Sequence, residues 1–177
     1  MSLRPSAFIS YSHQDGADFT HRLVFGLSMY MDVFFDIHLQ AGDYPKQLFK
    51  EIEKRDHFLF VMTPYSIKSK WCRDELEYAE KCGKSITLAM VFDSELVQRH
   101  ELTERYSYGP FHLDYEAGFR RVTELMLGKA TSSWEGFINL EKDEIIEALR
   151  QGLVPGIIAK EFVEWLMVEK LWAKLEK

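Results

Sequence analysis

The sequence lacks the features that mark nucleic-acid binders, membrane proteins and secreted proteins. The chain of 177 residues has a net charge of −6, so it has no excess of basic residues for contacts with a phosphate backbone. No apolar run approaches the roughly eighteen residues that a membrane-spanning helix needs, and the short polar start lacks the hydrophobic region of a signal peptide. We therefore expect a soluble, cytoplasmic protein that contacts neither nucleic acid nor membrane.

Cysteine is scarce, and the usual motifs for metals and nucleotides are missing. The two cysteines, Cys72 and Cys82, fall on one predicted helix nearly three turns apart, too far to form a disulfide bond. Free thiols in a reducing compartment are the simpler interpretation. The six histidines form no H-E-x-x-H pattern, and neither G-x-G-x-x-G nor a Walker A motif is present. We expect no bound metal and no resident cofactor.

The hydrophobic content of 46% is enough for one folded domain with an appendage. Apolar runs suit buried strands at residues 7–11, 33–35, 58–62 and 86–92, with a short edge strand at 111–113. Amphipathic spacing predicts helices at residues 18–31, from 45 onward, 66–82 and 115–127. Strands that alternate with helices in this way indicate a parallel sheet with helices on both faces.

The carboxyl ends of the predicted strands bring polar and aromatic residues to one rim of the sheet. Tyr11 and Ser12 end the first strand, and Asp36 follows the second. In open parallel sheets, ligands bind outside the carboxyl ends of the strands. The start of the helix at 66–82 would lie over the same rim. His13, just beyond the first strand, either approaches this cleft or is merely exposed.

The helix at 66–82 carries one carboxylate where an apolar residue is expected. At about 100° per residue, Leu76 and Ala79 fall on the same arc as Cys72, which should face the core. Glu75 lies only about 60° from Cys72 on that helix. One interpretation is a glutamate at the edge of the apolar stripe that reaches water or pairs with a basic neighbour. The other is a functional carboxylate. We interpret Cys72 as a packing residue.

Three motifs give the chain a family resemblance. They are FISYS at residues 8–12, VFFD at 33–36 followed by AGD at 41–43, and SKWCRDEL at 69–76. Together they resemble a TIR domain of the bacterial type over residues 6–127. The resemblance implies a flavodoxin-like five-stranded parallel sheet. Residues 128–177 match no motif of the family, and we expect a helical extension there, with helices at 141–151 and about 155–175. These helices either pack on the domain or form a surface for self-association, a partner or a further domain.

The resemblance implies one of two functions. Some TIR domains cleave NAD⁺ to nicotinamide and ADP-ribose or a cyclic isomer, with the glutamate that matches Glu75 as the catalytic residue. Trp71 would then line the nicotinamide side, while Tyr11 and Lys46 would contact the substrate. Bacterial members act in immune or toxin-like signalling and are switched on by self-assembly.

The alternative is a non-catalytic scaffold that binds other TIR domains through the loop that contains Gly42 and Asp43. The sequence leaves open the product isomer, the trigger, the oligomeric form and whether the chain is a fragment of a longer protein.

Overall fold

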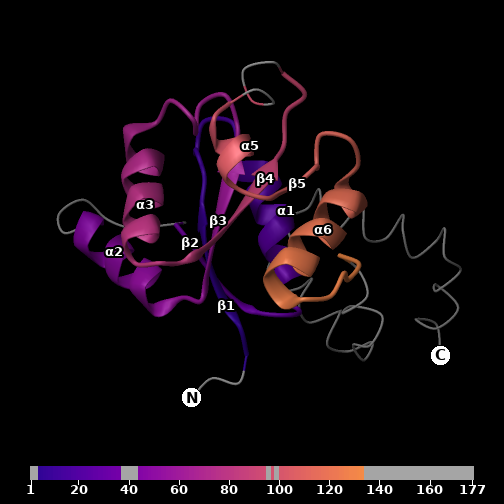
Figure 1. Cartoon of the computed structure of the whole chain (residues 1–177), viewed down its shortest axis with the longest axis horizontal. Coiled ribbons are helices and arrows are strands. Elements are labelled where there is room, and N and C mark those ends of the chain that lie inside the picture. The colour runs from indigo at the N-terminus through magenta and orange to yellow at the C-terminus, as the bar shows by residue number, and fades with distance from the viewer. Residues whose placement is uncertain (1–3, 37–43, 95–96, 98–99, 134–177) are drawn as a thin grey trace, which may run out of the picture. The chain divides into compact units, whose positions relative to one another are not determined.

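The computed structural model describes residues 4–36, 44–94, 97 and 100–133. In this part of the chain, five parallel strands form one sheet in the order β2-β1-β3-β4-β5 (Figure 1). The strands are β1 (Ser6–Ser10), β2 (Asp32–Phe35), β3 (His57–Met62), β4 (Ser85–Met90) and β5 (Tyr108–Gly109). The expected five-stranded parallel sheet is therefore confirmed.

Helices cover both faces of the sheet, as predicted. On one face lie α1 (Ala17–Leu27) and α6 (Tyr115–Leu127). On the other lie α2 (Tyr44–Lys54), α3 (Lys70–Lys81) and the short α5 (Leu102–Arg105) (Figure 1). The predicted helix at 66–82 begins later than expected, because Ser69 caps α3 while Ser66 exchanges hydrogen bonds with Thr63 in the preceding turn.

Alternate residues of the strands supply two separate cores. Phe8 points toward α2 and α3, whereas Ala7 and Ile9 point toward α1 and α6. The Phe8 ring stacks on Phe34 of β2 and Phe58 of β3, with ring centroids 5.5 and 5.6 Å apart. This alternation decides which residues of β1 face α3, and so which of them take part in the site described below.

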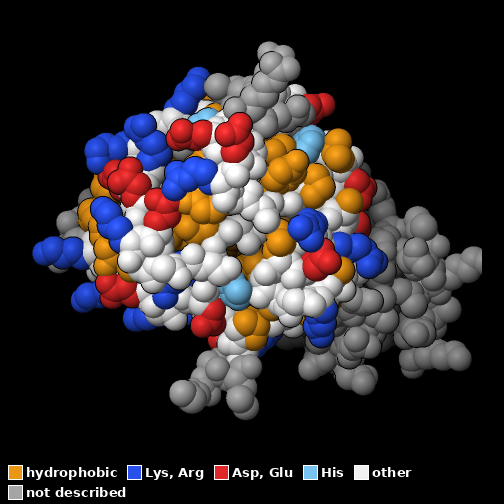
Figure 2. Space-filling view, in the orientation of Figure 1, with side chains coloured by type: hydrophobic (Ala, Val, Ile, Leu, Met, Phe, Trp, Pro, Cys, Tyr) orange, Lys and Arg blue, Asp and Glu red, His pale blue; other side chains and the backbone are white. Residues whose placement is uncertain are grey.

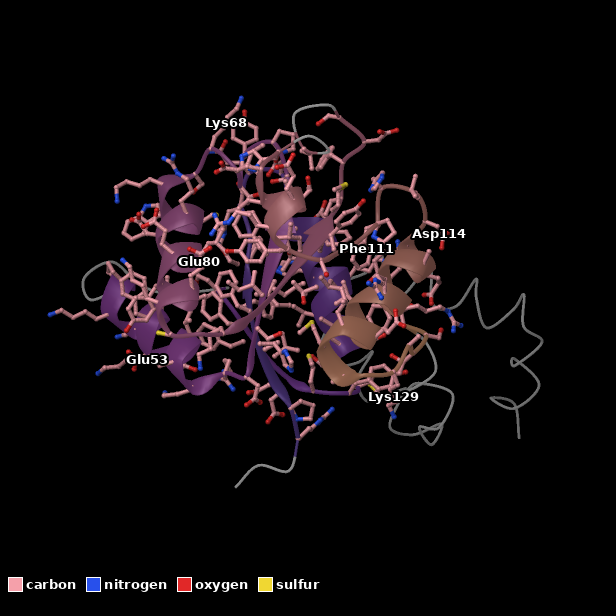
Figure 3. All side chains as sticks on the ribbon, in the orientation of Figure 1. Glu53, Lys68, Glu80, Phe111, Asp114 and Lys129 are labelled. Atoms are coloured by element: carbon pink, nitrogen blue, oxygen red, sulfur yellow. The ribbon has the colours of Figure 1, made fainter. Side chains whose placement is uncertain are left out.

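The fifth strand lies earlier in the chain than predicted. Residues 111–113 form a turn, and the strand is Tyr108–Gly109. Pro110 has no N–H to donate to the sheet, and Phe111 is buried beside α6 (Figure 3). The backbone N–H of His112 still donates to the carbonyl of Met90 at 2.9 Å. The apolar character of this stretch therefore serves packing against a helix, not strand pairing.

The close packing of α6 on this turn makes Gly118 a sensitive position. A Cβ atom at Gly118 would lie 2.5 Å from Cγ of Phe111 and 2.8 Å from its backbone nitrogen. Alanine in a helix is normally favoured over glycine by up to about 1 kcal/mol, but here the overlap should reverse the sign. We expect Gly118→Ala to lower the free energy of unfolding by about 1–3 kcal/mol in urea titrations. An unchanged or more stable variant would contradict this packing, and Arg120→Ala on the exposed side is the control.

The chain continues in contact with α6 beyond its end. Gly128 closes the helix in the left-handed conformation, with φ of 73°. The backbone N–H of Thr131 then donates to Thr123 Oγ1 at 3.0 Å. Residues 134–177, with the helices predicted at 141–151 and 155–175, lie outside the described residues. The division into domains at residues 6–127 and 128–177 therefore stays a prediction.

The described surface mixes charges of both signs. On the face shown in Figure 2, Lys and Arg side chains lie among Asp and Glu side chains on the side of α2 and α3, and the described residues form no extended basic patch there. Within residues 4–36, 44–94 and 100–133, no helix is both long and apolar enough to cross a membrane.

Candidate active site

A cleft of about 670 Å³ opens at the carboxyl end of β1. This volume lies within the usual range of small-molecule sites. The cleft lies where the strand order reverses around β1, which is the usual ligand position in sheets of this order. Its lining consists of residues 8–14, Asp36, Pro45, Ser69, Trp71, Cys72 and Glu75.

The first turn of α3 determines which of its side chains face the cleft. The Ser69 side chain accepts a hydrogen bond from the backbone N–H of Cys72 at 3.4 Å and so fixes the first turn. From there, Cys72 and Leu76 are buried against the sheet. Glu75 is also buried, with 8% of its surface exposed, while Trp71 one turn earlier is 53% exposed. The helical arc read from the sequence thus predicted the burial of Glu75.

Contacts farther along α3 hold the helix in place. Tyr78 stacks on Phe49 of α2, with ring centroids 4.3 Å apart. On the opposite side, Glu80 points toward α5 and accepts hydrogen bonds from Arg105 and Tyr106 (Figure 3). A helix fixed on two sides is a rigid support for the side chains that it presents to the cleft.

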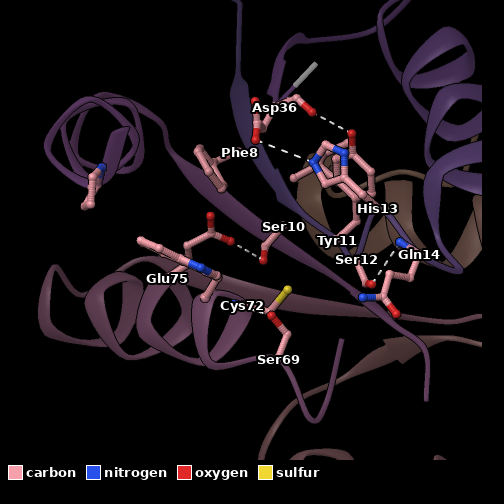
Figure 4. A pocket seen from close by; sticks show the side chains of 13 residues that line it. Phe8, Ser10, Tyr11, Ser12, His13, Gln14, Asp36, Ser69, Cys72 and Glu75 are labelled. Atoms are coloured by element: carbon pink, nitrogen blue, oxygen red, sulfur yellow. Dashed lines mark hydrogen bonds and ion pairs between the residues drawn. The ribbon is translucent and has the colours of Figure 1, made fainter. Parts of the chain in front are cut away.

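The Glu75 carboxylate faces β1 instead of solvent. It accepts a hydrogen bond from Ser10 Oγ at 2.5 Å (Figure 4). Burial raises the pKa of Glu75 from its ordinary value of 4.5 to about 7, the Asp36 and Asp74 carboxylates add to this, and the Ser10 hydrogen bond opposes it. Among the described residues, the hydrogen-bond partner of Glu75 is thus the Ser10 hydroxyl and not a basic side chain, and the carboxyl is largely buried, unlike the solvent-reaching or ion-paired glutamate of the alternative interpretation. Near neutral pH it holds a proton only loosely.

A second group of polar residues lines the other side of the cleft. The Tyr11 hydroxyl donates to the backbone carbonyl of Asp36 at 2.5 Å, and the His13 ring stacks on Tyr11 with centroids 4.7 Å apart. His13 Nε2 lies 3.5 Å from Asp36 Oδ2 (Figure 4). Burial, together with the Asp36 and Glu75 carboxylates, raises the pKa of Tyr11 to about 12, so its hydroxyl stays protonated.

The structure brings together most of the residues singled out from the sequence. Tyr11, Ser12, Asp36, Trp71 and Glu75 all line the cleft.

Three of the predicted residues are not among those lining the cleft. Lys46 lies exposed in the first turn of α2, next to the lining residue Pro45. Gly42 and Asp43 fall outside the described residues.

Ser10 was missed by the sequence reasoning. The available signal was the alternation along β1, since Ser10 shares a strand face with Phe8 and is the last residue of the strand, at its carboxyl end. Cys72 belongs to the core, and burial raises the pKa of its thiol, which disfavours a nucleophilic thiolate. Within the described residues, no group of three or more His, Cys, Asp or Glu is arranged to hold a metal ion.

The match to a protein-family model agrees with this architecture. A family model described as "TIR domain" matches residues 7–123, well over half of the chain. Among solved structures, the chain is similar to the TIR domains in the structure of the activated Roq1 resistosome directly recognizing the pathogen effector XopQ. That similarity has 15% sequence identity and a TM-score of 0.43, and it covers 83% of this chain and 98% of the other. A search of curated proteins finds no match.

Proposed function

The chain belongs to the TIR domain family, and from this premise we propose that it is an NAD⁺ nucleosidase of the bacterial type. It would cleave the bond between nicotinamide and ribose, giving nicotinamide and either ADP-ribose or a cyclic ADP-ribose isomer. NAD⁺ is then the substrate and no further cofactor is needed. The buried Glu75 carboxylate in the cleft is the observation that carries this proposal.

A single carboxylate is enough for this reaction. Most glycosidases need a second acid to protonate the oxygen that leaves. In NAD⁺ the leaving group is a pyridinium ring, which takes the electron pair of the broken bond and departs as neutral nicotinamide. The ionised Glu75 would stabilise the positive charge left at the anomeric carbon and hydrogen-bond the ribose hydroxyls. Water then attacks that carbon and releases a proton, or a nucleophilic atom of the adenosine half attacks it and forms a cyclic product.

The other lining residues have proposed roles around this reaction. Trp71 would lie against the nicotinamide ring, since its indole side chain lines the cleft and is 53% exposed. Tyr11, Ser12 and Asp36 would contact the ribose. Lys46, exposed beside the cleft, would contact the phosphates beyond it.

The proposal is tested by chromatography of NAD⁺ incubated with concentrated protein. We expect nicotinamide together with ADP-ribose or its cyclic isomer, and no such products with a folded Glu75→Ala variant. Equal product formation by both proteins would exclude Glu75 as the catalytic residue and, with it, this function.

Ser10 gives a second, independent test. Its hydrogen bond favours the ionised form of Glu75, so Ser10→Ala should raise the pKa of Glu75 further and reduce the active fraction. We expect the rate of nicotinamide release by Ser10→Ala at about pH 7 to be roughly three- to tenfold below that of the wild type. Above about pH 9 the difference between the two rates should become smaller. Ser12→Ala, the same change in the same cleft, should leave the pH midpoint of kcat in place. An unshifted midpoint in Ser10→Ala would show that this hydrogen bond does not tune the carboxylate.

Self-association is the second part of the proposal. The chain would assemble through contacts between TIR domains that include the loop with Gly42 and Asp43, and assembly would switch on NAD⁺ cleavage in bacterial immune or toxin-like signalling. The predicted C-terminal helices would offer a surface for a partner or further domain. A purely structural scaffold, the alternative, predicts association without NAD⁺ turnover. The buried Glu75 favours the enzyme, because a scaffold has no need of a carboxylate at this position.

A further inference from the structure

Two segments that are far apart in the sequence form walls of the cleft. The loop after β1 supplies residues 12–14, and α3 with its N-terminal cap supplies Ser69, Trp71, Cys72 and Glu75 (Figure 4). The spacing of these walls decides which groups a bound molecule meets at the same time. It depends on the contacts that join the two segments, because the local backbone of neither segment fixes it.

Asp15 joins the two segments, although it is not one of the described residues that line the cleft. Its Oδ1 accepts a hydrogen bond from Thr63 Oγ1 at 2.6 Å, and its Oδ2 accepts one from the backbone N–H of Tyr65 at 3.0 Å. Asp15 directly follows Gln14, whereas Thr63 and Tyr65 lie in the turn between β3 and α3. One carboxylate therefore connects the wall after β1 to the segment that leads into α3.

The turn between β3 and α3 carries this connection to the start of the helix. Thr63 and Ser66 are fully buried and donate their backbone N–H groups to each other's hydroxyl oxygens, at 2.8 and 3.1 Å. The carbonyl of Tyr65 accepts a hydrogen bond from the backbone N–H of Ser69 at 2.9 Å. Ser69 caps α3 and lines the cleft. Asp15 thus reaches α3 through a turn that hydrogen bonds hold in shape.

The loop after β1 is a compact unit of its own. The backbone N–H of Gly16 donates to the carbonyl of Ser12 at 2.9 Å, and that of Gln14 donates to Ser12 Oγ at 3.2 Å. Position 16 has no room for a side chain, since a Cβ atom there would lie 2.9 Å from the same carbonyl oxygen. A loop with such internal bonds keeps its shape when an outside contact is lost, but it moves more readily as a whole relative to its neighbours.

We propose that Asp15 is a positioning residue of the candidate active site, which holds the loop after β1 against the turn before α3 and so keeps these walls of the cleft at the spacing that binds the substrate. This inference rests on the proposed function and adds a residue to it. Asp15 acts through the loop residues that line the cleft, and it takes no direct part in breaking the bond between nicotinamide and ribose.

The loss of this contact is expected to change KM and not kcat. In the free protein, the loop would occupy the binding position for only part of the time, and the apparent affinity for substrate falls by that fraction. Bound substrate restores the position, so the saturated enzyme works at its normal rate. A variant that merely lowers the stability of the fold behaves differently, because it reduces the amount of active protein, and so the apparent kcat, without changing KM.

The test is the steady-state kinetics of nicotinamide release from NAD⁺ by concentrated wild-type protein and by Asp15→Asn. Asparagine has the shape of aspartate, but its amide nitrogen cannot accept the hydrogen bond from the N–H of Tyr65. We expect KM to rise by roughly three- to tenfold and kcat to stay within about twofold of the wild type. The matched control is Asp18→Asn, the same change at an exposed position of α1, which should leave both constants within about twofold.

Thr63 provides a second pair of variants that leaves Asp15 in place. Thr63→Ser keeps the hydroxyl that donates to Asp15 and should keep KM within about twofold of the wild type. Thr63→Val has a similar shape without the hydroxyl and should raise KM as Asp15→Asn does. Both changes disturb a buried position and lower the stability of the fold, so a difference in KM between them reports the hydrogen bond alone.

The outcomes separate this inference from the proposed function. Unchanged KM values in Asp15→Asn and Thr63→Val, with or without a lower apparent kcat, would overturn the inference and leave the NAD⁺ nucleosidase intact. An equal rise of KM in Asp18→Asn or Thr63→Ser would also overturn it, because the effect would then not depend on this contact. Absence of nicotinamide release from all of these proteins would overturn the proposed function and, with it, the inference.

Discussion

Replacing Glu75 with glutamine is expected to lower the rate of nicotinamide release from NAD⁺ by at least about a hundredfold while leaving the fold intact. Glutamine has nearly the same shape and keeps an oxygen that accepts the hydrogen bond from Ser10 Oγ. It has no negative charge to stabilise a cationic ribose. The loss should therefore appear in kcat, and the circular dichroism spectrum should be unchanged.

The matched control is Glu77→Gln, the same substitution on the same helix at an exposed position. It should retain activity within about twofold of the wild type, because the side chain lies on the solvent side of α3. If Glu77→Gln and Glu75→Gln lost activity equally, the effect would come from the stability or charge of α3 and not from the chemistry of Glu75.

The second large effect expected of Glu75→Gln is on the free energy of unfolding. This should rise, whereas the activity should fall. Because burial raises the pKa of Glu75 from 4.5 to about 7, the folded protein holds a proton there that the unfolded chain has already released. The free energy of unfolding therefore falls as the pH rises from 4.5 to about 7, and it stays at its lower value above that range. The shift corresponds to about 3 kcal/mol. Glutamine does not ionise and should escape this loss.

We expect the free energy of unfolding of Glu75→Gln to gain about 3 kcal/mol relative to the wild type between about pH 4 and pH 8. Urea titrations of both proteins across this pH range measure the difference in their free energies of unfolding. The titration of other residues contributes nearly equally to both proteins and so largely cancels in this difference. A difference that stays constant with pH would show that the carboxyl is not held in its neutral form by burial.

Glu51 offers a control of opposite sign. Hydrogen bonds from Lys54 and Arg55 hold the pKa of the Glu51 carboxyl below its ordinary value. The stabilisation is present above the unfolded pKa and is lost as the pH falls, so Glu51→Gln should be less stable than the wild type at neutral pH and approach it in acid. Two glutamates with opposite pH dependence would separate a functional carboxylate from a structural one.

The sequence predicted those parts of the site that depend on local geometry. The position of Glu75 on the buried side of α3 follows from the helical repeat alone, and the strand and helix alternation placed Tyr11, Ser12 and Asp36 at one rim. The structure agrees on all four of these positions.

The contacts that depend on pairing between distant segments were not predictable in the same way. Ser10 meets Glu75 across 65 positions of sequence, and the contact exists only because β1 is an interior strand of the sheet, between β2 and β3, and α3 packs near its end. The prediction of β5 at residues 111–113 was wrong for a related reason. A short apolar run such as Phe111 to Leu113 is equally compatible with a strand and with a turn packed under a helix. Only the packing of Phe111 against Gly118 distinguishes them.

The central claim is that Glu75 acts on the nicotinamide ribose in this cleft. The most direct measurement is a structure of the protein with a non-cleavable NAD⁺ analogue. We expect the Glu75 carboxylate to lie within hydrogen-bond distance, about 2.6–3.2 Å, of the ribose hydroxyls on the nicotinamide side, with Trp71 against the ring. An analogue bound with its nicotinamide ribose outside the cleft, and Glu75 still bonded only to Ser10, would contradict the account.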